Sequence, residues 1–296
     1  MTIQINSLNK RFGQTKALDN VSLSFGGQKI YGLFGHNGAG KTTLLGILTN
    51  RYFADSGEVT MDGQPIQNNE KALSQIYMLG EKNYYPEEMN VKDAIYWAAR
   101  FYPDFDKAYA GEIAKRFQLP LKKKITSLST GYETIFKIVI ALSSKAPFLL
   151  LDEPVLGLDA GHRDMFYKLL IERYSENPCT IVISTHLINE VAGLVEHCVI
   201  IKNGRIIKDV PCEELLNNGY SVSGAASSVD EYLRQGKEVI FSSNLGGLKT
   251  AAITGIAPGI NERPADLEFG KLNLQEYFIH LMSEEHVGNN LSEEAL

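Results

Sequence analysis

The sequence contains few of the features that mark secreted or metal-bound proteins. It has only three cysteines, Cys179, Cys198 and Cys212, and none of them lies in a CxxC pair. An odd number of widely spaced cysteines argues against a disulfide framework and against a zinc site. We therefore expect a reducing, cytosolic compartment, with each cysteine acting as a small buried or half-buried side chain.

A surplus of positive charge is also missing. The chain has 29 Lys and Arg against 35 Asp and Glu, which gives a formal charge of −6. Because nucleic-acid binding depends on a basic field, we expect no nucleic-acid partner. Hydrophobic residues make up 44% and charged residues 22%, ordinary values that exclude disorder, collagen and coiled coil.

Long apolar runs are absent as well. The most apolar long stretch, Ile138–Leu151, contains Lys145 and is shorter than the roughly 20 residues that span a bilayer. The first ten residues have no apolar core of signal-peptide length. We therefore expect a soluble chain, whose membrane role would come through a partner.

The 296 residues are enough for about two domains of roughly 150 residues. Residues 1–81 and 146–210 alternate between strands and helices, as in a largely parallel α/β sheet. The clearest buried strands are Ile30–Phe34, Phe148–Leu151 and Thr180–Ser184. Residues 82–145 are aromatic-rich and helical, so we expect them to form a helical subdomain.

The composition changes again near Pro211, where a segment rich in Gly, Ser and Ala begins at Gly219. We interpret residues 211–296 as a small α+β extension with a helix at Leu274–Met282. The last residues, 283–296, carry several glutamates and no Lys or Arg, and we expect a frayed end there.

A complete phosphate-binding motif follows the first buried strand. Residues Gly35–Thr42 read GHNGAGKT and match G-x-x-x-x-G-K-[ST], with a helix predicted over Lys41–Thr49. Backbone N–H groups at such a strand-to-helix turn point at phosphate oxygens, and glycines permit the close approach. The residues expected to bind the nucleotide here are Gly35, Asn37, Gly38, Ala39, Gly40, Lys41, Thr42 and Thr43. Lys41 should reach the β- and γ-phosphates, while the Thr42 hydroxyl should ligate Mg²⁺.

Two acidic residues end the strand at Phe148–Leu151. Ligands of open α/β sheets bind at the carboxyl ends of the strands, so the acids should lie near the phosphates. Asp152 is suited to holding Mg²⁺ through water, and Glu153 to polarising an attacking water. The expected chemistry is phosphoryl transfer.

Four further segments show a resemblance to ATP-binding-cassette (ABC) ATPases. Leu128–Tyr132 reads LSTGY and resembles the LSGGQ signature, and Gly157–Asp159 resembles the D-loop. Ser184–His186 resembles the switch-histidine segment, and Phe12 stands where the adenine-stacking aromatic is found. The resemblance implies a P-loop NTPase fold over 1–210, with a RecA-like core, an antiparallel β subdomain and a helical signature subdomain, followed by the small extension 211–296.

The family resemblance also implies a mechanism. ABC ATPases work as head-to-tail pairs, so Ser129 and Gly131 would contact the γ-phosphate held by a second cassette, a homodimer or heterodimer partner. His186 would bind the γ-phosphate and help Glu153 position water. ATP and Mg²⁺ are implied as ligands.

The same resemblance implies a polytopic membrane permease as partner and a place on the cytoplasmic face of the membrane. The run Phe101–Asp106 resembles bacterial drug- or peptide-export cassettes. A soluble ABC ATPase with an assembly or regulatory role remains the alternative.

Three positions depart from the family pattern. Glu81 stands where the family has Gln, and its carboxylate could ligate Mg²⁺ while repelling phosphate. Thr130 and Tyr132 replace Gly and Gln in the signature. The aromatic residues after Glu81 could either line a groove for the permease or form the core of the helical subdomain. They are Tyr84, Tyr85, Tyr96, Trp97, Phe101 and Tyr102, of which Tyr84 and Tyr85 are the better interface candidates.

Overall fold

The computed structural model describes residues 1–283 and divides the chain into two compact units. The first unit holds Met1–His186 and Val199–Asp209, and the second holds Leu187–Cys198 and the chain from Val210 onward. The division predicted from sequence, between residues 210 and 211, stays a prediction; the two divisions assign residues 187–198 differently. Residues 284–296 of the predicted extension, with most of its expected frayed end, lie outside the described residues.

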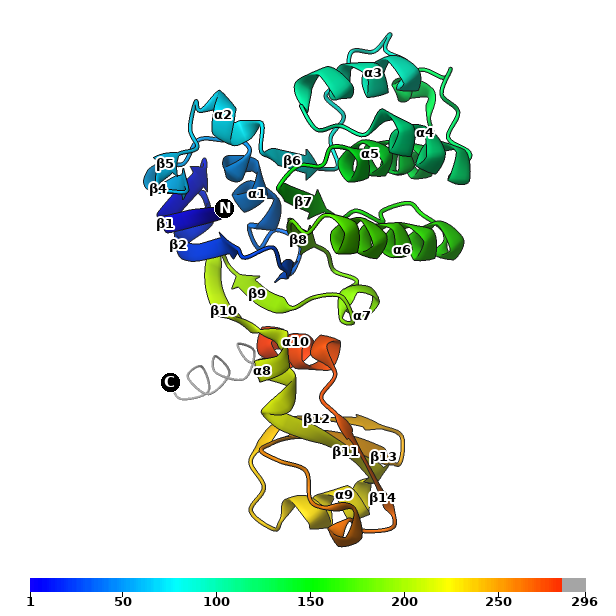
Figure 1. The fold of residues 1–296 in the computed structure, drawn as a ribbon. Helices are drawn as coiled ribbons and strands as arrows, with labels where there is room; N and C mark the ends of the chain where they lie inside the picture. Colours follow the sequence, from blue (N-terminus) through cyan, green and yellow to red (C-terminus); the bar gives the residue numbers. More distant parts are fainter. Residues whose placement is uncertain (284–296) are drawn as a thin grey trace. The chain divides into compact units, whose positions relative to one another are not determined.

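A six-stranded sheet forms the centre of the first unit (Figure 1). Its strands, in spatial order, are β10 (Arg205–Pro211), β9 (His197–Lys202), β3 (Ile30–Phe34), β8 (Thr180–Ser184), β7 (Phe148–Asp152) and β6 (Ile76–Leu79). Strands β3, β8, β7 and β6 pair in parallel, and every residue in them is buried. Continuous apolar runs are typical of strands covered on both faces, so the predicted parallel α/β sheet is confirmed.

A smaller antiparallel sheet packs beside the central one. Its order is β2-β1-β4-β5, with β1 (Thr2–Phe12), β2 (Thr15–Gly26), β4 (Ser56–Met61) and β5 (Gln64–Pro65). Alternate residues of β1, among them Ile3 and Ile5, point into a core that also contains Leu44 and Leu45 of helix α1 (Lys41–Leu48). This shared core fixes α1 between the two sheets. The short helix α2 (Glu70–Leu73) precedes β6.

Helices make up the segment between β6 and β7. They are α3 (Val91–Phe101), α4 (Lys107–Arg116), the 3₁₀ turn η1 (Ile125–Ser127) and α5 (Thr130–Ser143). Asparagine and aspartate side chains cap α3 and α4, at Asn90 and Asp106. Helix α5 packs beside α6 (Ala160–Glu176), as Figure 1 shows. The predicted helical subdomain therefore forms, and α5 connects it to the sheet.

The second unit has its own small core. It contains α7 (Ile188–Val191), α8 (Cys212–Asn217), α9 (Ala226–Leu233), the 3₁₀ turn η2 (Ile260–Glu262) and α10 (Leu274–Ser283). Its antiparallel sheet runs β12-β13-β11-β14, with β11 (Gly219–Ala225), β12 (Val239–Leu245), β13 (Leu248–Thr254) and β14 (Leu267–Lys271). Tyr220 and Val222 of β11 pack against Val229 of α9. The predicted α+β character of the extension is confirmed.

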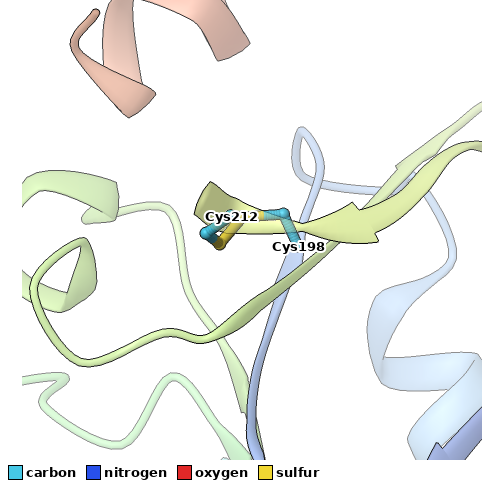
Figure 2. The surroundings of a disulfide bond; sticks show 2 residues. All are labelled: Cys198 and Cys212. Carbon is cyan, nitrogen blue, oxygen red and sulfur yellow. A yellow bond between two sulfur atoms is a disulfide. The ribbon is translucent and has the colours of Figure 1, made fainter. Parts of the chain in front are cut away.

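The expectation that the cysteines form no disulfide is wrong. Cys198 on β9 and Cys212 at the start of α8 form a disulfide in the second unit, with an S–S distance of 2.05 Å (Figure 2). Asn203 and Gly204, both with positive φ, make the two-residue turn that returns the chain from β9 to β10. The Cys212 N–H then donates to the Glu196 carbonyl over 2.9 Å, which brings the sulfurs together.

Cys179 keeps its thiol and is buried, and burial raises its pKa. Within residues 1–283, no helix is both long and apolar enough to cross a membrane.

The disulfide predicts a thiol count. In denaturant, the unreduced protein should titrate one thiol, that of Cys179, and the reduced protein three. Reduction should also lower the free energy of unfolding of the second unit by about 3 kcal/mol, because the bond no longer constrains the unfolded chain in a loop of about 15 residues. Denaturant titration of the oxidised, reduced and Cys198→Ser proteins measures this change in the free energy of unfolding. Three thiols before reduction would contradict the pairing.

Candidate functional site

The phosphate loop turns directly from a buried strand into a helix. β3 ends at Phe34 and α1 begins at Lys41, so residues 35–40 form the connection. Gly40, the N-cap of α1, has φ +112°, and a Cβ there would lie 2.5 Å from the Ala17 carbonyl oxygen. A larger residue is excluded twice over, by backbone strain and by the close approach.

Lys41 lies buried inside this loop. Its side chain is 6% exposed, and Nζ donates to the carbonyl oxygens of Gly35 at 2.7 Å and His36 at 3.2 Å. Burial lowers the pKa of the ammonium, whereas the nearby carboxylates of Glu153 and Asp152 raise it in part. The loop therefore holds a cation in place at the N-terminus of α1, where an anion is favoured.

The acidic pair lies at the end of β7, beside the end of β8. Asp152 pairs with Ser184 in the parallel register, and the Ser184 hydroxyl donates to Asp152 Oδ1 over 2.8 Å. The Glu153 N–H donates to the Ser184 carbonyl over 2.8 Å. Glu153 itself has φ +48°, an uncommon value for a residue with a side chain. Strained backbone of this kind is common in active sites.

Glu153 and His186 are in direct contact. His186 Nδ1 lies 3.0 Å from both carboxylate oxygens of Glu153, and the Thr185 hydroxyl donates to Oε2 over 3.1 Å. The Glu153 side chain is 22% exposed and that of His186 54% exposed, so both remain open to solvent. The carboxylate is thus oriented by two neighbours while it keeps access to water.

One cavity collects these groups. Its volume is about 410 Å³, which is enough for the polyphosphate part of a nucleotide. Among the residues that line it are Asn37, Gly38, Gly40, Lys41, Thr42, Thr43, Glu81, Asp152, Glu153, Leu156 and His186. A cation at a helix start and a pair of oriented carboxylates therefore face the same space.

Residues 18–156 match the ABC transporter family. The ABC transporter ATP-binding protein YtrB of Bacillus subtilis (strain 168) is 30% identical over 213 residues, which are 72% of this chain and 73% of YtrB.

This chain belongs to the ABC transporter ATP-binding proteins.

Other relatives agree with this assignment. The bacitracin transport ATP-binding protein BcrA of Bacillus licheniformis is 29% identical over 72% of this chain and 71% of its own length. A dimeric ATP-binding cassette in a post-hydrolysis state, bound to ADP and Pi, has the same fold, with a TM-score of 0.62. It is 21% identical to this chain, and the match covers 71% of this chain and 98% of the length of that cassette. The P-loop NTPase fold, ATP binding and ATPase activity expected from the resemblance are confirmed. The alternative of a soluble assembly factor is not favoured.

The cassette has oxygen donors that suit Mg²⁺. The Thr42 hydroxyl and the carboxylates of Asp152 and Glu81 line the same cavity. Mg²⁺ is usually held by one or two carboxylates together with substrate phosphates and water. Within residues 1–283, no cluster of three His, Cys, Asp or Glu side chains could hold a metal by itself. The donor set therefore fits an ion that arrives with the nucleotide.

Some predicted site residues lie outside the phosphate cavity of the cassette. Ser129 caps α5, where its hydroxyl accepts from the Tyr132 N–H over 3.4 Å, and a Cβ at Gly131 would lie 2.8 Å from the Gly157 carbonyl. Phe12 is 46% exposed at the end of β1, in edge contact with Tyr52. Gly35 and Ala39 belong to the phosphate loop but do not line the cavity. The Ala39 carbonyl accepts a hydrogen bond from the Gly204 N–H. Ser129 and Gly131 are thus not among the residues that line the phosphate cavity.

Three contacts at the site were not predicted from sequence. The Ser184 and Thr185 hydroxyls bind the acidic pair, and Lys137 of α5 binds the Glu81 main chain. The resemblance of segment 184–186 to the switch-histidine segment points to His186 and gives no role to the two hydroxyls. A lone lysine in the apolar run of α5 was the available signal for Lys137.

Replacing Lys41 with alanine tests the phosphate loop. Loss of a buried cation aimed at the phosphates should lower ATPase kcat at least about 100-fold, the usual cost of one preorganised donor. Lys71→Ala, an exposed lysine on α2, is the matched control and should keep the wild-type rate. Steady-state ATPase assays on both variants decide it, and an active Lys41→Ala protein would overturn the assignment.

Proposed function

We propose that this chain is the ATP-hydrolysing subunit of a bacterial exporter, pairing with a second cassette and driving a separate permease. It would work at the cytoplasmic face of the membrane, held there by the permease. Support for export comes from the resemblance of residues 101–106 to export cassettes and from the relationship to a bacitracin transport protein.

One observation carries the proposal. The phosphate cavity holds the cation, the carboxylates and the histidine needed for hydrolysis, but Ser129 and Gly131 lie outside it. A γ-phosphate bound there would lack donors on its open side. A second cassette that presents its own signature would supply them, with the N-terminus of α5 directed at the anion.

The chemistry then follows from the contacts. Lys41 binds the β- and γ-phosphates, and Mg²⁺ bound with ATP would neutralise phosphate charge. Glu153 accepts a proton from the attacking water, while His186 and Thr185 fix the orientation of its carboxylate. The signature of one cassette binds the nucleotide of the other only when the triphosphate is present. Formation of the closed pair therefore depends on ATP.

A separate apolar groove suits the permease. Its volume is about 680 Å³, and its lining includes Tyr84, Tyr85, Trp97, Phe101 and Tyr102. Tyr84 is 62% and Phe101 72% exposed, whereas Tyr85 packs on Phe136. Some of these aromatic residues therefore belong to the core of the helical subdomain and others to its surface. Exposed aromatic side chains at a groove are typical anchors for a partner helix.

Glu153→Gln tests hydrolysis and pairing together. The amide keeps the shape but accepts no proton, so kcat should fall by about 100-fold or more while ATP stays bound. The variant should therefore accumulate as a pair in ATP, as seen by size-exclusion chromatography with light scattering. Glu172→Gln, an exposed glutamate on α6, serves as the control. Wild-type turnover in Glu153→Gln would remove Glu153 from its role.

Phe101→Asp tests the groove. A charge at an exposed anchor should reduce recovery of a polytopic protein co-purified in detergent by about tenfold. The ATPase rate of the isolated chain should not change. Ile171→Asp, at an exposed apolar residue of α6, should leave co-purification intact. Equal recovery with both variants would place the permease elsewhere.

A further inference from the structure

Lys137 is a buried lysine on the signature helix. It is 7% exposed, and every residue of α5 from Thr134 to Ser143 is buried around it. Lysine is almost never buried unless it is paired, because removing an ammonium from water is costly. Its position therefore calls for partners of its own.

The partners come from two different segments. Lys137 Nζ donates to the main-chain carbonyl of Glu81 over 2.7 Å and lies 2.8 Å from Glu133 Oε1, one turn earlier on α5. The Tyr77 hydroxyl of β6 donates to the Lys137 carbonyl over 3.4 Å. The ammonium thus joins α5 to the loop that follows β6.

Lys137 also lies between two hollows. One is the apolar groove described above, and the other is a hollow of about 40 Å³ lined by Glu81, Glu133, Asp152 and Glu153 among others. Among the described residues, Lys137 is the one charged side chain that the two linings share. It therefore lines a hollow that four acidic residues also line, and on the other side it lines the aromatic groove.

A second bond ties α5 to another residue that lines the phosphate cavity. The Thr134 hydroxyl donates to the Leu156 carbonyl over 2.8 Å, and Leu156 lines that cavity, as Glu81 does. The same helix begins with the signature, at Ser129. A rotation of α5 would therefore move the signature and both cavity loops together.

We propose that Lys137 is a positioning residue that ties the Glu81 loop to α5. The placement of Glu81 in a chain's own phosphate cavity then changes together with the orientation of the signature that this chain offers to its partner. The inference rests on the proposed function, because it requires a paired cassette. Lys137 acts through the Glu81 main chain and does not touch the nucleotide.

Lys137→Met tests the proposal, since methionine fills a similar space without the charge or the donor. ATPase kcat should fall about tenfold, because the carboxylates lose their placement, while KM for ATP changes less than about twofold. The Hill coefficient for ATP should fall towards one, because the two sites lose their coupling. Lys137→Arg, which keeps a cation and a donor, should recover kcat to within about threefold of wild type.

Lys168→Met is the matched control. Lys168 makes the same kind of pair, 2.7 Å from Asp164 one turn earlier on α6, but both side chains are more than half exposed. Its kcat and Hill coefficient should equal those of the wild type. Wild-type values of both in Lys137→Met would overturn the proposal.

Glu133→Gln covers the case in which Lys137→Met does not fold. It removes the charge partner and keeps the bond from Lys137 to the Glu81 carbonyl. A smaller drop in kcat, about threefold at constant KM, supports the proposal, and an unchanged kcat overturns it.

Trypsin cleavage after Lys82 separates this inference from the proposed function. Lys82 is exposed in the loop that Lys137 holds, so cleavage there in the absence of ATP should become several-fold faster in Lys137→Met. An unchanged cleavage rate refutes the tie. A wild-type protein that never pairs in ATP refutes the proposed function but leaves the cleavage result standing.

Discussion

The parallel register of β3, β8 and β7 is the constraint on which the site depends. It sets the carboxyl ends of three buried strands at one edge of the sheet, where the phosphate loop, the acidic pair and His186 follow them. Asp152 stands opposite Ser184 in this register, Glu153 follows Asp152, and His186 lies two residues after Ser184. A slip of one residue in either strand would turn these side chains away from one another.

Much of this arrangement was predictable from the sequence. Runs such as Ile30–Phe34 and Thr180–Ser184 are largely apolar without alternation, a pattern typical of strands buried on both faces, and every residue in them is buried. The order of glycines and lysine in the phosphate loop is typical of phosphate binding and of few other structures. The roles of the site residues are proposals, and the placement of Lys41, Asp152, Glu153 and His186 around one cavity agrees with the chemistry expected from the motif.

Other features could not be predicted for physical reasons. Gly219–Ala225 has low β propensity, yet it forms a strand between two neighbours, because small residues are required there: a Cβ on Gly219 would lie 2.6 Å from the Ile253 carbonyl oxygen. Lys137 binds a main-chain carbonyl, an acceptor that every residue possesses and that no side-chain pattern reveals. An odd cysteine count excludes complete pairing only, so it could not exclude the pair Cys198 and Cys212.

The same disulfide encloses the turn between β9 and β10 in a covalent ring. The chain passes from the second unit into the first and back again within residues 198–212. A single break of the backbone at the Asn203–Gly204 turn would therefore leave both fragments attached through sulfur. In this chain, the two parts of the second unit that lie on either side of the turn stay joined after such a nick, and separating the fragments requires an electron donor as well as a cut.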